Sequence, residues 1–125
     1  MYTYFAIALG GAAGAMTRYW LYTLIQDTHR SAFPYGTLVV NVLGSFLIGV
    51  CFVVFAERTS LDAQWRPVVI VGFLGAMTTF SAFSLESLLL FEQGLYNTAL
   101  LYIVSSVAVC LLAAFLGLQL SRALF

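Results

Sequence analysis

Charged residues are scarce in this sequence, and lysine is missing altogether. Five arginines and five acidic residues are all that 125 positions contain, so charged residues make up 8% of the chain and apolar ones 62%. A soluble domain of this size needs far more charge to cover its surface. The shortage of charge therefore excludes an ordinary soluble domain and predicts a membrane protein.

The residues on which most enzyme and metal chemistry depends are also in short supply. The chain has one histidine, and its two cysteines, Cys51 and Cys110, lie far apart without a C-x-x-C spacing. Such cysteines are typical of buried apolar thiols rather than of a disulfide or a metal site. The sequence also has no phosphate-binding loop and no nucleophile–base pair. We therefore expect neither an enzyme nor a nucleic-acid partner.

Long apolar runs are what the sequence has in abundance. Four of them stand out, and they cover residues 2–25, 34–56, 67–91 and 95–123. Each exceeds the roughly 20 residues with which a helix crosses a hydrocarbon core of about 30 Å. The runs predict an all-α membrane protein, with one domain over residues 1–125, four transmembrane helices and both termini on the same side. We expect a multi-pass protein of a bacterial-type inner membrane.

The arginines give almost no preference for one orientation in the lipid bilayer. The side of the termini has Arg58, Arg66 and Arg122, and the opposite side has Arg30, joined by Arg18 if that side chain snorkels outward. Because an excess of positive residues on one side normally sets orientation, this chain could insert either way up. An antiparallel, dual-topology homodimer with a two-fold axis in the membrane plane is then feasible. A single orientation, fixed by lipid or by Arg58, is the alternative.

Small residues recur at four-residue spacing in the first two runs, at Gly10 and Gly14 and at Ser45 and Gly49. This spacing lets helix backbones approach closely, and in lipid such packing holds helices together. The pairs suit contacts within one chain as well as assembly of several chains.

The third apolar run is interrupted by polar groups. Its middle holds five hydroxyls, two glycines and one carboxylate, which belong to Thr78, Thr79, Ser81, Ser84, Ser87, Gly72, Gly75 and Glu86. At membrane depth, polar side chains and loosened backbone are tolerated only against protein or a water-filled path. We therefore predict a third helix that is broken near its middle and lines a path across the membrane, or binds something within it. Carbonyls freed where the helix unwinds would suit a small cation.

Two residues outside this stretch, Arg18 and Asn41, allow two interpretations each. Arg18 could lend a positive potential to an anion vestibule, or it could snorkel to the lipid headgroups. Asn41 could hold helices together, or its amide N–H groups could donate to an anion.

Aromatic and acidic residues of the last two runs are further candidates. Phe80 and Phe83 stand three positions apart; rings at this spacing usually pack, but their positive edges could face an anion. Glu86 could carry protons, pair with the arginine of the first run, or lie at the membrane surface. Tyr102 and Ser106 share a helix face and could extend a polar track.

Three motifs, in the right order and spacing, resemble the Fluc (CrcB-type) fluoride channel family. They are GGAAGAMTRY at residues 10–19, GTLVVNVLGSF at 36–46 and GFLGAMTTFSAFSLE at 72–86. The resemblance implies a dual-topology, antiparallel homodimer with two pores, which lowers cytoplasmic fluoride by passive export. The chain departs from the family at Ala82, where a threonine is frequent, and so lacks one hydroxyl there.

The same resemblance assigns roles to single residues. Phe80 and Phe83 would line the pore with their ring edges. Asn41 would be the pore amide, and Arg18 would belong to the vestibule. A structural, non-transported Na⁺ would be held by carbonyls that both subunits supply, those of Gly75 and Thr78. The remaining polar residues of the pore would be Thr79, Ser81, Tyr102 and Ser106.

Two other classes of function stay open. A proton-coupled exporter of the small multidrug type also has four short spans, but it depends on a carboxylate in the first span, where this chain has Arg18. A non-transporting membrane scaffold would explain the apolar runs, but not the hydroxyl-rich break. Passive conduction suits the sequence better, because a succession of weak donors can replace the water around a small anion without trapping it.

Overall fold

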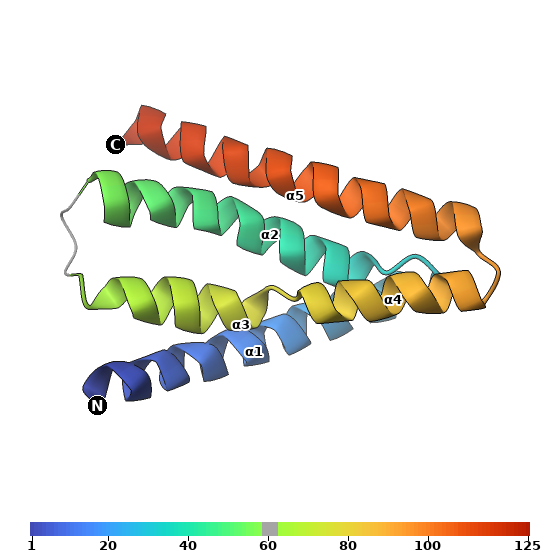
Figure 1. The fold of residues 1–125 in the computed structure, drawn as a ribbon, viewed down its shortest axis with the longest axis horizontal. Coiled ribbons are helices and arrows are strands. Elements are labelled where there is room, and N and C mark those ends of the chain that lie inside the picture. Colours follow the sequence, from blue (N-terminus) through green and yellow to red (C-terminus); the bar gives the residue numbers. More distant parts are fainter. Residues whose placement is uncertain (59–62) are drawn as a thin grey trace.

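Helices make up all the regular structure that the computed structural model describes, which covers residues 1–58 and 63–125. They form four long rods that run alternately in opposite directions (Figure 1). The rods are α1 (Tyr2–Thr28); α2 (Tyr35–Phe52) with its π-helical continuation η1 (Val53–Glu57); the π-helical η2 (Pro67–Leu74) with α3 (Gly75–Met77) and α4 (Phe80–Glu92); and α5 (Tyr96–Leu124). Both chain termini lie at the same end of the bundle, as the sequence predicted.

Three segments of the described chain are long and apolar enough to cross a membrane. They are Tyr35–Glu57, Pro67–Glu92 and Tyr96–Leu124. Helix α1 has 27 residues, about 40 Å at 1.5 Å per residue, so it is long enough to cross, but it is not among the three because its composition is less apolar. The chain is therefore an all-helical membrane protein.

Glycines let α1 lie directly on the backbone of η2. A Cβ atom added at Gly14 would stand 2.1 Å from the Phe73 carbonyl oxygen, and one at Gly10 would stand 2.5 Å from that of Val68. On the other side of the contact, a Cβ at Gly72 would meet the Ile7 carbonyl oxygen at 2.7 Å. No larger residue fits at these distances, so the small-residue spacing of the first run serves packing within the chain.

Helices α2 and α5 approach each other in the same way. A Cβ at Gly49 would stand 2.2 Å from the Ala114 carbonyl oxygen, and one at Gly117 would stand 2.1 Å from that of Phe46. Each helix thus offers a glycine to the backbone of the other. At the end of this pair, Arg122 of α5 forms an ion pair with Glu57, to which its Nε donates at 3.0 and 3.1 Å.

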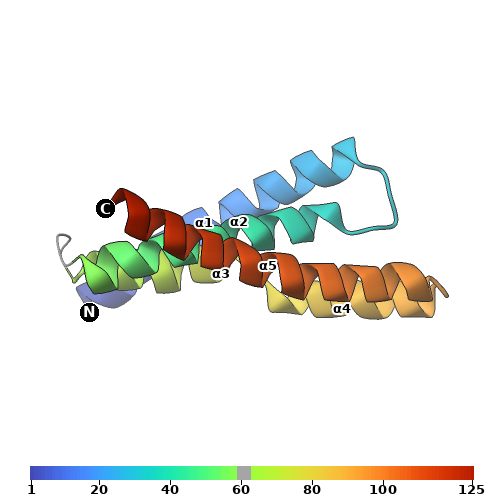
Figure 2. The same cartoon turned by 90° about the horizontal axis from the view of Figure 1, so that it is seen from above.

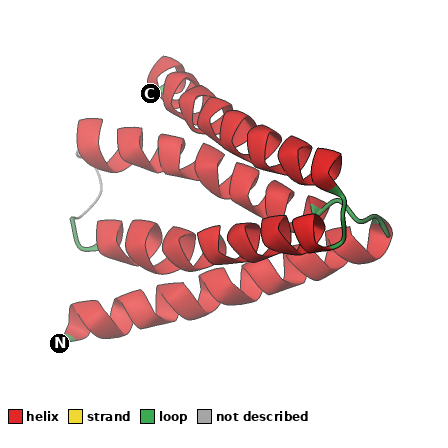
Figure 3. Cartoon of the chain, turned by 45° about the vertical axis from the view of Figure 1, so that its right-hand side comes forward, coloured by secondary structure: helices red, strands yellow, loops and turns green. Residues whose placement is uncertain are grey.

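The rods do not stay together along their whole length. Figure 2 shows the second half of α1 leaning away from α4 at the end opposite the termini. Figure 3 shows the loop between α1 and α2 and the loop between α4 and α5 at the same end of the bundle, opposite the termini. The divergence leaves room for polar residues between α1, α2 and α4, next to the place where the third rod is interrupted.

Candidate functional site

The third rod is broken at Thr78 and Thr79, as the sequence predicted. Helix α3 ends at Met77, both threonines have extended backbones (ψ of 150° and 118°), and α4 begins at Phe80. The hydroxyl of Thr79 caps the new helix by accepting the Ala82 N–H at 3.1 Å. The hydroxyl of Thr78 donates backwards to the Leu74 carbonyl at 2.9 Å. The Thr79 hydroxyl thereby satisfies one backbone N–H group that the break exposes, whereas the Leu74 carbonyl already accepts the Thr78 N–H at 3.0 Å.

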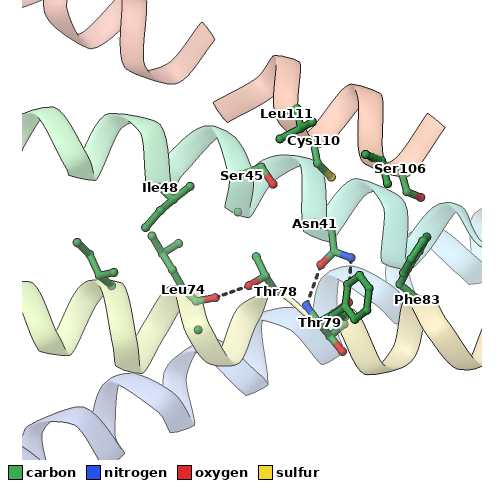
Figure 4. Close-up of a pocket in the computed structure, with 15 residues that line it drawn as sticks. Asn41, Ser45, Ile48, Leu74, Thr78, Thr79, Phe83, Ser106, Cys110 and Leu111 are labelled. Atoms are coloured by element: carbon green, nitrogen blue, oxygen red, sulfur yellow. Dashed lines mark hydrogen bonds between the residues drawn. The ribbon is translucent and has the colours of Figure 1, made fainter. Parts of the chain in front are cut away.

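Asn41 of α2 braces this break (Figure 4). Its Oδ1 accepts the Thr79 N–H at 2.8 Å, and its Nδ2 donates to the Thr79 carbonyl at 3.0 Å. In an unbroken helix the same Thr79 N–H would bond to the Gly75 carbonyl, so that carbonyl has lost its regular partner. Asn41 does hold helices together, but only one of its two amide N–H groups is used in the described part of the chain.

A groove of about 490 Å³ runs along the break, between α2, the third rod and α5 (Figure 4). Most of its wall is apolar, and the part of the chain that the structure describes gives it no charged residue. Seven residues singled out from the sequence line it: Asn41, Gly75, Thr78, Thr79, Phe80, Phe83 and Ser106. The groove thus gathers, from three rods, most of the site that the sequence predicted.

The two phenylalanines stand at one end of the groove with ring centroids 5.3 Å apart and tilted by 46°. Phe83 also packs on Tyr102 at 5.3 Å. Phe80 is 77% exposed, because it projects beyond the edge of the chain. Phe83 therefore packs on two neighbouring rings, whereas the described chain leaves most of Phe80 uncovered.

Glu86 of α4 lies inside the bundle and is held by two hydroxyls. Its Oε1 accepts from the Thr37 hydroxyl and its Oε2 from the Tyr102 hydroxyl, both at 2.7 Å. Thr37 and Tyr102 are 2% and 0% exposed. Glu86 itself is half-buried, and within the described residues it forms no ion pair with Arg18. Sequence reasoning missed Thr37, although it stands four residues before Asn41 and so shares its helix face.

The remaining polar candidates differ in their surroundings. Tyr102 does not line the groove, and it reaches the site by packing on Phe83 and by donating to Glu86. Ser81 is exposed and its hydroxyl lies 3.1 Å from that of Thr79. Ser106 lines the groove, is 6% exposed, and its buried Oγ has no hydrogen-bond partner among the residues that the structure describes. An unpartnered buried hydroxyl in the wall of a groove is rare, and it indicates a place for a water or an ion.

A second cavity of about 370 Å³ lies on the other side of the break, where α1 leans away. Its wall contains both charged groups of the site, Arg18 and Glu86. Its other lining residues are Tyr19, Tyr22, Thr37, Val40, Thr79 and Ala82. Thr79 lines this cavity and the groove alike, so the break in the third rod stands between the two spaces.

A cation site made of side chains is not found in the described part of the chain, which brings no three histidine, cysteine or acidic residues together. Backbone carbonyls at the break would have to supply the ligands. Gly75 and Thr78, the two residues that the sequence singled out for this role, both line the groove.

Fold and site together define a class: a helical membrane protein in which a broken, asparagine-braced helix separates an uncharged groove from a charged cavity. A family model described as "CrcB-like protein, Camphor Resistance (CrcB)" matches residues 5–118. The chain belongs to this family.

Curated relatives extend the comparison. The "Fluoride-specific ion channel FluC" of Methylococcus capsulatus is 51% identical over 120 residues, which are 96% of this chain and 53% of that protein. The chain thus spans about half the length of this relative. A protein of the same name from Magnetococcus marinus is 50% identical over 93% of this chain and 94% of its own length. A third, from Hahella chejuensis, is 45% identical over 93% and 91%.

Proposed function

We propose that this chain forms a fluoride-selective channel, through which fluoride leaves the cytoplasm passively. The relatives named above are called fluoride-specific ion channels, and they match nearly the whole of this chain. The observation that carries the proposal is the break at Thr79, which stands between a charged cavity and an uncharged groove. An anion can collect in the first space and pass the break into the second.

The groove offers weak donors and no cation. In the described chain the second amide N–H of Asn41 and the buried Ser106 hydroxyl have no partner, and the rings of Phe80 and Phe83 can present positive edges. Fluoride is small and strongly hydrated, so a conducting path must replace its water without binding it too tightly to release. A succession of neutral donors meets both demands. Thr79 and Ser81 add hydroxyls at the break, and Tyr102 contributes through Glu86.

The working unit that we propose is an antiparallel homodimer in the inner membrane, with α1 as a fourth crossing of each chain. Phe80 projects from the edge of the chain, next to the open side of the groove. A second copy related by a two-fold axis in the membrane plane would cover this edge and complete two pores. The nearly balanced arginines allow the two orientations that such a dimer needs.

The dimer would also create the site for a structural Na⁺. One chain supplies the carbonyls of Gly75 and Thr78, and the Gly75 carbonyl has lost its regular helix partner to Asn41. Two carbonyls are too few to enclose a small cation, but two chains double the set. Such a cage discriminates by size and by the number of carbonyls, so Na⁺ would be favoured over K⁺ and would stay in place.

The proposal is tested in liposomes that contain the purified protein and are loaded with fluoride and chloride. An ion-selective electrode for each ion measures what leaves, and protein-free liposomes are the control. We expect rapid loss of fluoride while chloride stays inside. Comparable loss of both ions would contradict a selective channel.

The same preparation distinguishes a channel from a proton-coupled exporter, which the buried carboxylate of Glu86 would otherwise favour. Fluoride that leaves alone builds up a membrane potential that opposes further loss. Adding valinomycin in the presence of K⁺ removes this potential, so fluoride efflux should accelerate. Efflux that ignores valinomycin would mean that protons or another ion accompany fluoride.

A further inference from the structure

The groove wall contains a thiol. Cys110 of α5 lines the groove one helical turn after Ser106, on the same helix face. Figure 4 shows both side chains pointing from α5 toward the groove. The second cysteine is different, because Cys51 packs against the apolar cluster around Leu74 and Met77 and lines neither cavity.

A second observation indicates that this part of the groove can hold a water molecule or an ion. The Ser106 Oγ is buried in a 6% exposed side chain, and the described part of the chain gives it no hydrogen-bond partner. Buried hydroxyls nearly always have one, supplied by protein, by water or by an ion. Because Cys110 shares the groove with Ser106, a small solute that reaches this hydroxyl also reaches the thiol.

We propose that Cys110 is a binding site for soft, thiophilic metal ions, and that its occupation blocks the channel. The inference rests on the proposed function, since it takes the groove to be part of the conduction path. Soft metals prefer thiolate sulfur over the oxygen donors that form the rest of the polar wall. Neutral mercuric chloride is a suitable probe, because it can enter from lipid as well as from water.

The reaction is a ligand exchange without redox change. A sulfur–mercury bond forms at Cys110, while the S–H bond and one mercury–chloride bond break. The proton and the chloride ion pass to water, and a bulky S–Hg–Cl group is left in the groove. It fills space beside Ser106 that a fluoride ion would need.

The experiment uses chains with a single cysteine. Cys51→Ala keeps only Cys110, and Cys110→Ser keeps only Cys51; each is compared with itself before and after mercuric chloride. We expect Cys51→Ala to gain one mercury by intact-protein mass spectrometry and to lose roughly tenfold or more of its fluoride efflux, because a single constriction controls flux through a pore. An excess of 2-mercaptoethanol should restore both. Cys110→Ser should keep its efflux, whether or not Cys51 takes up mercury.

The inference is overturned if Cys51→Ala takes up no mercury, or takes it up and conducts as before. It is also overturned if mercury blocks Cys110→Ser to the same extent. A failure of the proposed function looks different: fluoride efflux would be absent in the unmodified protein before any mercury is added, while the mass measurement would still report whether Cys110 binds the metal.

Discussion

Asparagine 41 offers the sharpest test of how the break is held, through the substitution Asn41→Asp. The aspartate keeps the shape of the side chain and can still accept the Thr79 N–H, which lies 2.8 Å from Oδ1 of Asn41 in the unaltered chain. It can no longer donate to the Thr79 carbonyl, which lies 3.0 Å from Nδ2. Instead, a negatively charged oxygen would face that carbonyl across the distance of a hydrogen bond.

The expected loss of stability follows from these two effects. A carbonyl shielded from water that loses its donor costs about 1–3 kcal/mol, and at this half-buried position a carboxylate without a cationic partner adds to the cost. We expect a loss of about 2–4 kcal/mol, measured by thermal unfolding in detergent followed by size-exclusion chromatography. Fluoride efflux in liposomes should fall as well, since Thr79 separates the two cavities.

A matched control and a pH series make the test specific. Asn97→Asp introduces the same chemical change at an exposed position of α5, and it should stay within about 0.5 kcal/mol of the original protein. On acidification the new carboxyl group takes up a proton and can donate to the Thr79 carbonyl again. The Asn41→Asp variant should therefore regain stability as the pH falls, whereas the unaltered chain has no such gain. Equal stability of the two variants at neutral pH would refute the brace.

Three further predictions concern the pore, the carboxylate and the dimer. Phe80→Ile and Phe83→Ile keep an apolar side chain but remove the positive ring edge, so fluoride efflux should fall sharply while size-exclusion chromatography still shows a folded dimer. Phe115→Ile on the exposed face of α5 is the control. Unchanged efflux would mean that the two rings serve only packing. Glu86→Gln should keep substantial fluoride efflux that still responds to valinomycin, because a passive path needs no proton carrier; electroneutral transport that this change abolishes would favour an exchanger. Replacing Na⁺ by a large organic cation should lower fluoride efflux or the stability of the dimer. Cysteines introduced near the termini should be labelled from both sides of the membrane. Labelling from one side only, together with an efflux that does not depend on Na⁺, would contradict the antiparallel dimer.

The sequence predicted the helices and the break because both depend on the residue types within a short segment of the chain. Long apolar runs define the rods, and a cluster of hydroxyls and glycines in the third run marks where a helix cannot remain regular at membrane depth. The sequence indicated unwinding around Gly72 and Gly75 with Thr78 and Thr79, and the structure confines the extended backbone to the two threonines. Asn41 of another helix bonds to the backbone of Thr79, and this contact could not be read from the sequence.

The two hydroxyl groups that donate to Glu86 could not be predicted from the sequence, because the residues that carry them are far from Glu86 in the chain. Thr37 lies 49 positions from Glu86, and Tyr102 lies 16 positions from it on the other side. Only the packing of α2, α4 and α5 decides which hydroxyls face one carboxylate. The glycine spacing was ambiguous for the same reason, and the close contacts of Gly10 and Gly14 with η2 settle that this spacing serves packing within the chain.

The placement of charge around the break bears on how a selective anion path can also release its ion. Arg18 lies in the second cavity, on the far side of Thr79 from the uncharged groove. Opposite unit charges about 4 Å apart attract by about 1 kcal/mol in water and by about 4 kcal/mol at an effective dielectric constant of 20. At the dielectric constant of water the guanidinium would therefore attract fluoride only weakly, whereas a cation in the mostly apolar groove, with about 4 kcal/mol of attraction, would slow release roughly a thousandfold. Glu86 faces the same cavity with a negative charge, but hydroxyls bond to both of its oxygens, and this disperses the charge that an incoming anion meets. Under the proposed function, fluoride is drawn in where water still screens it and passes on where only neutral donors remain.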